Sequence, residues 1–119
     1  MKKSDKKIDN QICQALTIAC ESAKDKVAGF QWLTHFVDYN QFPGSLSIVC
    51  IFDTKVELEL ACQDEKDQLI VSLINTELQA IQVNLKQISQ HISFYTEEAC
   101  QLESNGKWPE YFRKSRLLR

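Results

Sequence analysis

Glycine and proline are scarce in this chain, with three and two residues among 119. The three glycines, Gly29, Gly44 and Gly106, stand alone, and none belongs to a G-x-G or G-K-[ST] sequence. Loops that surround phosphate groups with backbone N–H groups need glycines in such patterns. The sequence therefore argues against nucleotide binding by a phosphate-binding loop.

Long apolar runs are also missing. No run approaches the roughly 20 residues that a membrane-spanning helix needs. The first ten residues, MKKSDKKIDN, are mostly charged and lack the apolar core of a signal peptide. We therefore expect a protein without a membrane segment that works in the cytoplasm.

The residue types that bind metals show no paired spacing. The two histidines, His35 and His91, lie far apart, and the five cysteines include no C-x-x-C pair. An odd number of widely spaced cysteines among apolar neighbours is typical of buried, reduced side chains. Cys50 lies in an apolar segment and Cys100 follows two glutamates, so neither is expected to be a nucleophile. We expect no disulfide framework, no metal and no cofactor.

The chain does contain enough apolar sequence for one core. Its 44% hydrophobic and 25% charged residues are typical of a single soluble domain. The charge is uneven: residues 2–7 hold four lysines and one aspartate, residues 107–119 five basic residues and one glutamate, and residues 8–106 five lysines and 14 carboxylates. We interpret the chain as one domain over residues 1–119, with an acidic body and basic ends, 1–7 and 107–119, that have the composition of flexible tails.

Apolar residues at helical spacing predict a first helix over residues 8–27. Ser4 or Asp5 is available as its N-cap, Asp9 falls in its first turn, and Gly29 ends it. The apolar stripe is rich in alanine, so another element can approach its backbone closely.

The segment WLTHFVDYNQFPGS, residues 32–45, fits both helical and strand periodicity. Its Trp, Thr, Phe, Val and Tyr residues favour a strand, and Pro43 forces Phe42 out of the helical region. The following SLSIVCIF is apolar on both faces, as in a strand covered on both sides. We predict an antiparallel hairpin of residues 31–39 and 46–52.

The second half of the chain predicts more helices than strands. Thr54 and Glu57 form a capping box before helices at 55–62 and 66–80, which are either one bent helix or two. Alternating apolar residues from Ile81 to Phe94 predict one or two strands, the later at 91–95. Thr96 caps a short helix that ends before Gly106. This order predicts an α+β fold with a mainly antiparallel sheet of three or four strands, packed with N-terminal, central and short C-terminal helices.

Polar residues near the predicted strand ends form the candidate cleft of an enzyme. His35 and Asp38 would act as base and orienting carboxylate on a helix, but they point to opposite faces of a strand. Asp53 lies at a strand-to-helix corner, where ligands often bind in open sheets, although it can equally stabilise the helix N-terminus. If strand 91–95 lies beside strand 46–52, later residues join it. The candidate cleft comprises His35, Asp38, Asp53, Thr54, His91, Glu97 and Glu98.

A nucleic-acid interface has one candidate segment. Residues 55–80 most resemble a helix-turn-helix, but residues 67–80 contain two acidic and no basic residues and would repel phosphate. A KH-like reading lacks the G-x-x-G loop. The basic, aromatic C-terminal segment can stack bases, dock on a partner protein or remain a solvated tail. Its candidate binding residues are Lys107, Trp108, Tyr111, Arg113, Lys114, Arg116 and Arg119.

Three stretches, FQWLTHFVDYNQFPGSLSIVCIFDT, FYTEEAC and GKW, resemble a set of small bacterial proteins of similar length. Some of these carry the label "Fis family transcriptional regulator", and the resemblance covers most of the chain. Fis proteins are helical dimers that end in a basic helix-turn-helix, whereas this chain has a predicted strand pair and an acidic central helix. The resemblance therefore carries over neither the regulator function nor any catalytic residue.

We expect a non-catalytic interaction or regulatory module whose partner is another protein or a second copy. An apolar helix and a hairpin edge in a small domain offer surfaces for such pairing. One alternative is a nucleic-acid-associated regulator that binds through its basic termini. The other is an enzyme with its site around Asp53 and His35.

Overall fold

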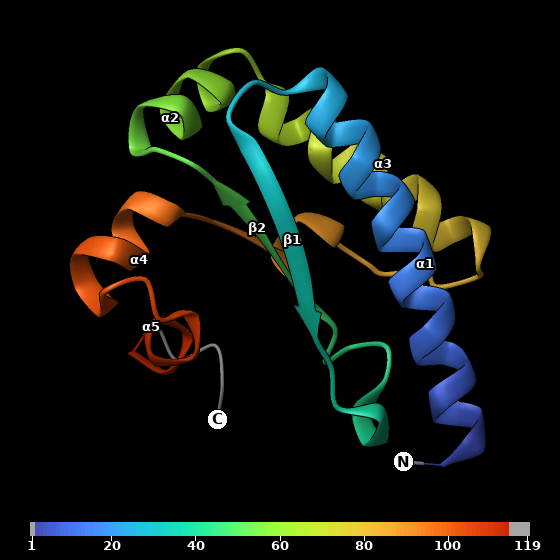
Figure 1. Ribbon diagram of the computed structural model, residues 1–119. Coiled ribbons are helices and arrows are strands. Elements are labelled where there is room, and N and C mark those ends of the chain that lie inside the picture. Colours follow the sequence, from blue (N-terminus) through green and yellow to red (C-terminus); the bar gives the residue numbers. More distant parts are fainter. Residues whose placement is uncertain (1, 115–119) are drawn as a thin grey trace.

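The computed structural model describes residues 2–114 and shows an α+β fold in which helices cover both faces of a three-stranded sheet (Figure 1). The predicted fold class is confirmed. The elements in chain order are α1 (Lys3–Lys26), β1 (Phe30–Phe36), the 3₁₀ helix η1 (Tyr39–Gln41), β2 (Ser47–Phe52), α2 (Lys55–Gln63), α3 (Lys66–Ala80), the 3₁₀ helix η2 (Ile88–His91), β3 (Ile92–Thr96), α4 (Glu97–Ser104) and α5 (Trp108–Lys114).

The sheet has the order β1-β2-β3 and is mixed. The predicted hairpin is confirmed, because β1 and β2 pair antiparallel and Leu33 lies opposite Cys50. β2 and β3 run parallel, with Ile48 opposite Ile92, so the sheet is not mainly antiparallel. The parallel pairing follows from the connection between β2 and β3. Its helices α2 and α3 carry the chain back to the end of the sheet where β2 began, and a crossover of this kind joins parallel strands.

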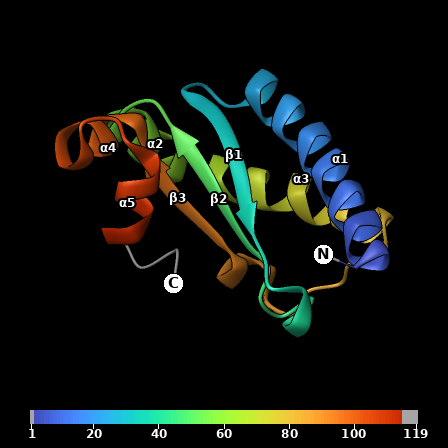
Figure 2. The same ribbon diagram turned by 60° about the horizontal axis from the view of Figure 1, so that its bottom comes forward.

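β2 is buried on both faces, as its apolar sequence predicts. Ile48, Cys50 and Phe52 belong to a core with α1, α2 and α3, whereas Val49 and Ile51 belong to a second core with α4 and α5. Figure 2 shows α1 and α3 on one side of the sheet and α4 and α5 on the other. The strict alternation along β2 therefore supplies two separate apolar layers.

A bulge at the start of β1 assigns its aromatic residues to different layers. Phe30 lies opposite Phe52 and Trp32 lies opposite Ile51, so Gln31 is an extra residue in β1. Phe30 therefore packs in the core formed with α1, α2 and α3, which we call the α1–α3 layer, and its ring centroid lies 5.8 Å from that of Phe52. Trp32 packs in the second core, formed with α4 and α5, which we call the α4–α5 layer.

The first helix begins earlier than its periodicity predicts. α1 starts at Lys3, and its N-cap is Lys2, which makes no side-chain cap hydrogen bond. The predicted cap at Ser4 or Asp5 is therefore wrong, and residues 3–7 are helical. After α1, Gly29 has a φ of 85°, and a Cβ there would lie 2.6 Å from the Cβ of Glu57, which explains why glycine stands at this position.

The predicted helix caps in the second half are confirmed. The Thr54 side chain accepts a hydrogen bond from the Glu57 N–H at the start of α2, and the Thr96 side chain accepts one from the Ala99 N–H in α4. α2 and α3 are two helices, separated at Glu65, whose φ is 58°.

Residues 81–85 do not form the additional strand that their alternation allows. They follow α3 as a turn and an irregular segment, and Gln82 has a φ of 65°. The Val83 N–H donates to the Leu78 carbonyl, and the Val83 side chain is buried in the α1–α3 layer. The alternating apolar residues of this segment therefore pack against the core from an irregular connection and do not form a paired strand.

The basic C-terminal segment is helical over residues 108–114 where a flexible tail was expected. Tyr111 and Phe112 are buried in the α4–α5 layer, and Trp108 packs against it. The rings of Phe36 and Phe112 meet edge to face, with centroids 5.3 Å apart. α5 is thus part of the core, while residues 115–119 lie outside the described residues.

Candidate functional site

The seven residues of the predicted cleft lie at two opposite ends of the sheet. The parallel pairing puts the carboxyl ends of β2 and β3 together, and the Glu98 N–H donates to the Asp53 carbonyl at 3.0 Å. His35 and His91 lie at the other end, near the start of β2. A strand of six residues is about 17–20 Å long, so the two groups share no cleft. The predicted enzyme site around Asp53 and His35 does not assemble.

Three of the four polar residues at the carboxyl end, Thr54, Glu97 and Glu98, accept N–H groups of helix termini or indoles, whereas the Asp53 side chain is exposed. The Glu98 carboxylate accepts the Lys55 N–H at 2.8 Å in the first turn of α2. The Glu97 carboxylate accepts N–H donors from two indoles, Trp32 at 2.6 Å and Trp108 at 3.3 Å. Together with the Thr54 cap, these contacts join β1, α2, α4 and α5.

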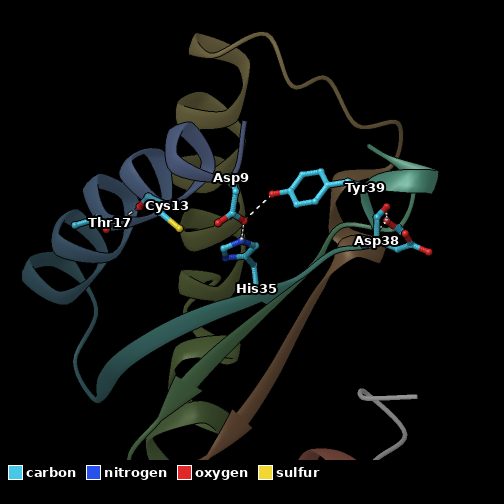
Figure 3. Close-up of polar contacts among 7 residues, drawn as sticks. Asp9, Cys13, Thr17, His35, Asp38 and Tyr39 are labelled. Carbon is cyan, nitrogen blue, oxygen red and sulfur yellow. Dashed lines mark hydrogen bonds and ion pairs between the residues drawn. The ribbon is translucent and has the colours of Figure 1, made fainter. Parts of the chain in front are cut away.

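At the opposite end, Asp38 and His91 also have local partners. The Asp38 carboxylate accepts the Asn40 N–H at 3.0 Å and caps η1. The His91 ring Nδ1 lies 2.7 Å from the Leu46 carbonyl oxygen, to which it donates. His35 and Asp38 do not pair, as the strand prediction implied, and Figure 3 shows Asp38 pointing away from His35.

His35 instead joins a cluster that bridges α1, β1 and η1. The Asp9 Oδ1 atom accepts the Tyr39 hydroxyl at 2.6 Å and lies 3.4 Å from the His35 Nε2 atom. Cys13 follows Asp9 by one helical turn, and donor atoms of Asp9, Cys13 and His35 all lie within 4.8 Å of one another. Figure 3 shows the three side chains converging from α1 and β1, with Tyr39 reaching back from η1.

The electrostatics of this cluster define its protonation. The hydrogen bond from Tyr39 is the main cause that lowers the pKa of Asp9; burial opposes it, and His35 adds to it. Burial and the bond to Asp9 raise the pKa of Tyr39, so its hydroxyl keeps the proton that it donates. Burial and the Asp9 carboxylate raise the pKa of Cys13. Cys13 is therefore a thiol and not an activated nucleophile.

A cleft of about 430 Å³ extends from this cluster between α1 and β1. Leu16 and Cys20 of α1 and Leu33 of β1 give it an apolar centre, while Glu21 and Lys24 add charge. Burial raises the pKa of Cys20, and a hydrogen bond from the Leu33 backbone partly offsets this. The Leu33 N–H therefore points into the cleft, away from β2.

The structure also places the candidate nucleic-acid residues. Tyr111 is buried and Trp108 is half-buried, and their rings lie edge to face with centroids 5.3 Å apart, which leaves the Tyr111 ring no free face for a base. The Lys114 ammonium donates to the Glu103 carbonyl at 2.7 Å. The exposed cations are Lys107, Arg113 and Lys114, and Arg116 and Arg119 lie outside the described residues.

Sequence reasoning overlooked the Asp9–Cys13–His35 set because its members have no motif spacing. The only local signal is that Asp9 and Cys13 stand four apart on one helix face. His35 comes 22 residues after Cys13 and reaches the cluster only through the packing of β1 beside α1.

Comparison with protein-family models, curated proteins and solved structures gives no match to this chain. The resemblance to the small bacterial proteins labelled "Fis family transcriptional regulator" therefore stays an expectation. Among the helices of residues 2–114, none has the length and apolar character needed to cross a membrane.

Proposed function

We propose that this protein is a non-catalytic interaction module that binds an extended segment of a partner protein along the free edge of β1. One observation carries the proposal: within residues 2–114, β1 pairs with β2 alone, and its other edge faces the cleft beside α1. An edge strand presents unpaired N–H and C=O groups that can pair with an added strand.

The cleft has the dimensions and lining for such a segment. Its volume of about 430 Å³ falls in the range of ligand pockets, roughly 300–1,000 Å³. Leu16, Cys20 and Leu33 offer apolar contact to one side chain of the segment, and Glu21 and Lys24 offer contact to a polar neighbour.

The backbone of β1 supports pairing in a defined register. The Leu33 N–H donates to the Cys20 thiol, which is a weak acceptor, and a peptide carbonyl would be a stronger partner. In an antiparallel strand every second residue turns its backbone groups to the same edge, so His35 shares this side with Leu33, whereas Thr34 faces β2.

The chemistry of the site favours binding over catalysis. The side chains of the predicted enzyme site lie at two ends of the sheet, and Thr54, Glu97 and Glu98 at the carboxyl end accept backbone or indole N–H groups. Cys13, which adjoins the cleft, has a raised pKa and lacks the thiolate that nucleophilic catalysis requires.

Selection of linear peptides from a displayed library on the wild-type protein tests the proposal. Thr17 and Thr76 are exposed threonines on α1 and α3, and only Thr17 is among the residues that line the cleft. Thr17→Trp fills the cleft, and Thr76→Trp is the matched control. We expect selected peptides to lose at least tenfold in affinity for Thr17→Trp and to bind Thr76→Trp like the wild type.

Amide hydrogen exchange locates the bound peptide. Bound peptide should slow exchange at Leu33 and His35 and leave Thr34 unchanged. Peptides that bind both Trp variants equally, or a library that yields no cleft-dependent binder, would overturn the proposal. Sedimentation velocity covers self-association: a dimer that dissociates only in Thr17→Trp identifies a second copy as the source of the segment.

A further inference from the structure

We propose that Asp9, Cys13 and His35 form a binding site for one divalent transition-metal ion of the zinc class. This site goes beyond the proposed peptide binding. Cys13 and His35 also line the peptide cleft, whereas Asp9 belongs to the metal site alone. It combines one carboxylate oxygen, one sulfur and one imidazole nitrogen, all within 4.8 Å of one another.

The geometry requires little rearrangement. Metal–ligand bonds of about 2.0–2.3 Å in a tetrahedral site place the ligand atoms about 3.5 Å apart. The exposed Cys13 side chain can close the remaining gap by a change of rotamer, because it lies at the surface of α1. The Asp9 and His35 side chains, with exposed fractions of 31% and 15%, are already in contact at 3.4 Å.

The donor set selects the class of metal. Sulfur and imidazole ligands favour zinc, cobalt and related ions, whereas calcium and magnesium require several oxygen ligands. Only one carboxylate belongs to the set. Three protein ligands leave a fourth position for water, as in metal sites that remain open to solvent.

Proton and charge balance are simple. The ion binds the Asp9 carboxylate, the neutral His35 ring and the Cys13 sulfur, and the Cys13 thiol releases one proton to solvent. The two negative ligands neutralise the two charges of the ion. Tyr39 keeps its proton and its hydrogen bond to the Asp9 Oδ1 atom, which leaves Oδ2 free for the metal and fixes the carboxylate as an outer partner does.

Alkylation under reducing conditions provides a test with an internal control. Cys13 and Cys62 are both exposed, and only Cys13 belongs to the donor set. Zinc should slow alkylation of Cys13 at least tenfold, leave Cys62 unchanged, and lose its effect when a chelator is added. Peptide mass spectrometry measures both cysteines in the same sample. Equal protection of both cysteines, or protection of neither, overturns the proposal.

Cobalt spectroscopy tests the ligands directly. One equivalent of Co²⁺ should give a thiolate-to-cobalt charge-transfer band that disappears in Cys13→Ser and persists in Cys62→Ser. His35→Gln and Asp9→Asn should weaken binding, and Tyr39→Phe, an outer-partner variant, should raise Kd by roughly 10–100-fold. Circular dichroism checks that each variant is folded. A band that survives in folded Cys13→Ser, or that is absent from the wild type, refutes the site.

Discussion

Glu97→Gln should destabilise the protein because the Glu97 carboxylate of α4 joins β1 to α5 within the α4–α5 layer. Its two oxygens accept the indole N–H groups of Trp32 in β1 and Trp108 in α5. The two rings meet edge to face, with centroids 5.1 Å apart. An amide has one acceptor oxygen and one NH₂ group, so one indole N–H would then face a second donor.

The magnitude follows from the two bonds. A hydrogen bond to a charged acceptor contributes about 1.5–3 kcal/mol and a neutral one about 0.5–1.5 kcal/mol, so conversion of the shorter bond costs about 1 kcal/mol. Loss of the second bond costs about 1 kcal/mol, since water reaches part of each half-buried indole. Removal of a negative charge from the first turn of α4 adds about 0.3–1 kcal/mol. We expect a loss of about 2–3 kcal/mol in the free energy of unfolding.

Urea denaturation measures this loss with a suitable probe, because Trp32 and Trp108 are the two tryptophans of the chain. Their fluorescence therefore reports on the site itself, and circular dichroism reports on the helices. Glu103→Gln is the matched control on the same helix, since Glu103 is exposed, and it should change the free energy of unfolding by less than about 0.5 kcal/mol.

A double-mutant cycle with Trp108→Phe isolates the contact between Glu97 and Trp108. Phenylalanine keeps much of the ring packing and removes the N–H group, so the second substitution should cost less in the background of the first. We expect a coupling of about 1 kcal/mol. If the losses of the two single variants sum to the loss of the double variant within about 0.3–0.5 kcal/mol, the two groups do not interact and the reasoning is refuted.

Three further outcomes follow from individual groups. Tyr39→Phe should cost about 1–2 kcal/mol at neutral pH; because the folded protein lowers the pKa of Asp9, this stabilisation is present above the unfolded pKa of about 3.9 and is lost as pH falls through the lower folded value. Urea melts of both proteins should therefore converge below about pH 4, and a constant difference would contradict this. Ser104→Ala should raise the free energy of unfolding by about 1 kcal/mol, because the buried Ser104 hydroxyl has no hydrogen-bond partner within residues 2–114; a loss in thermal denaturation would show that the hydroxyl is satisfied. Burial raises the pKa of Cys50 to about 12, so a thiol reagent should modify Cys50 only after unfolding and Cys62 in the folded protein, and equal rates in native buffer would disprove the burial.

The elements that depend on local sequence were predicted well. The capping threonines Thr54 and Thr96 and the doubly apolar β2 follow from neighbours a few residues away, which is why their positions agree with the structure. The direction of β3 could not be predicted in this way. It depends on how far α2 and α3 carry the chain before it returns to the sheet, and the strand's own sequence does not encode that.

The candidate site could not be predicted for the same reason, because its contacts join residues that lie far apart in the sequence. His35 was recognised as a polar residue worth attention, but pairing with Asp38, three residues away, was considered only for a helical segment, and Asp9 was not considered as a partner. The structure gives it Asp9, 26 residues earlier in the chain, and Cys13. Residues 107–119, which include α5, were interpreted as a basic tail because they carry five basic residues, although Tyr111 and Phe112 are buried.

The division of the core into two layers has a consequence for synthesis of the chain. The hairpin ends at residue 52, whereas the side chains of α5 that cover its Trp32 and Phe36 face come from residues 108–112. At a translation rate of roughly 5–20 residues per second, the ribosome needs roughly 3–12 s to add the intervening stretch. Throughout that interval the residues that cover the Trp32 and Phe36 face have not yet been made, so α5 cannot bury this face of the hairpin until residue 112 has been added.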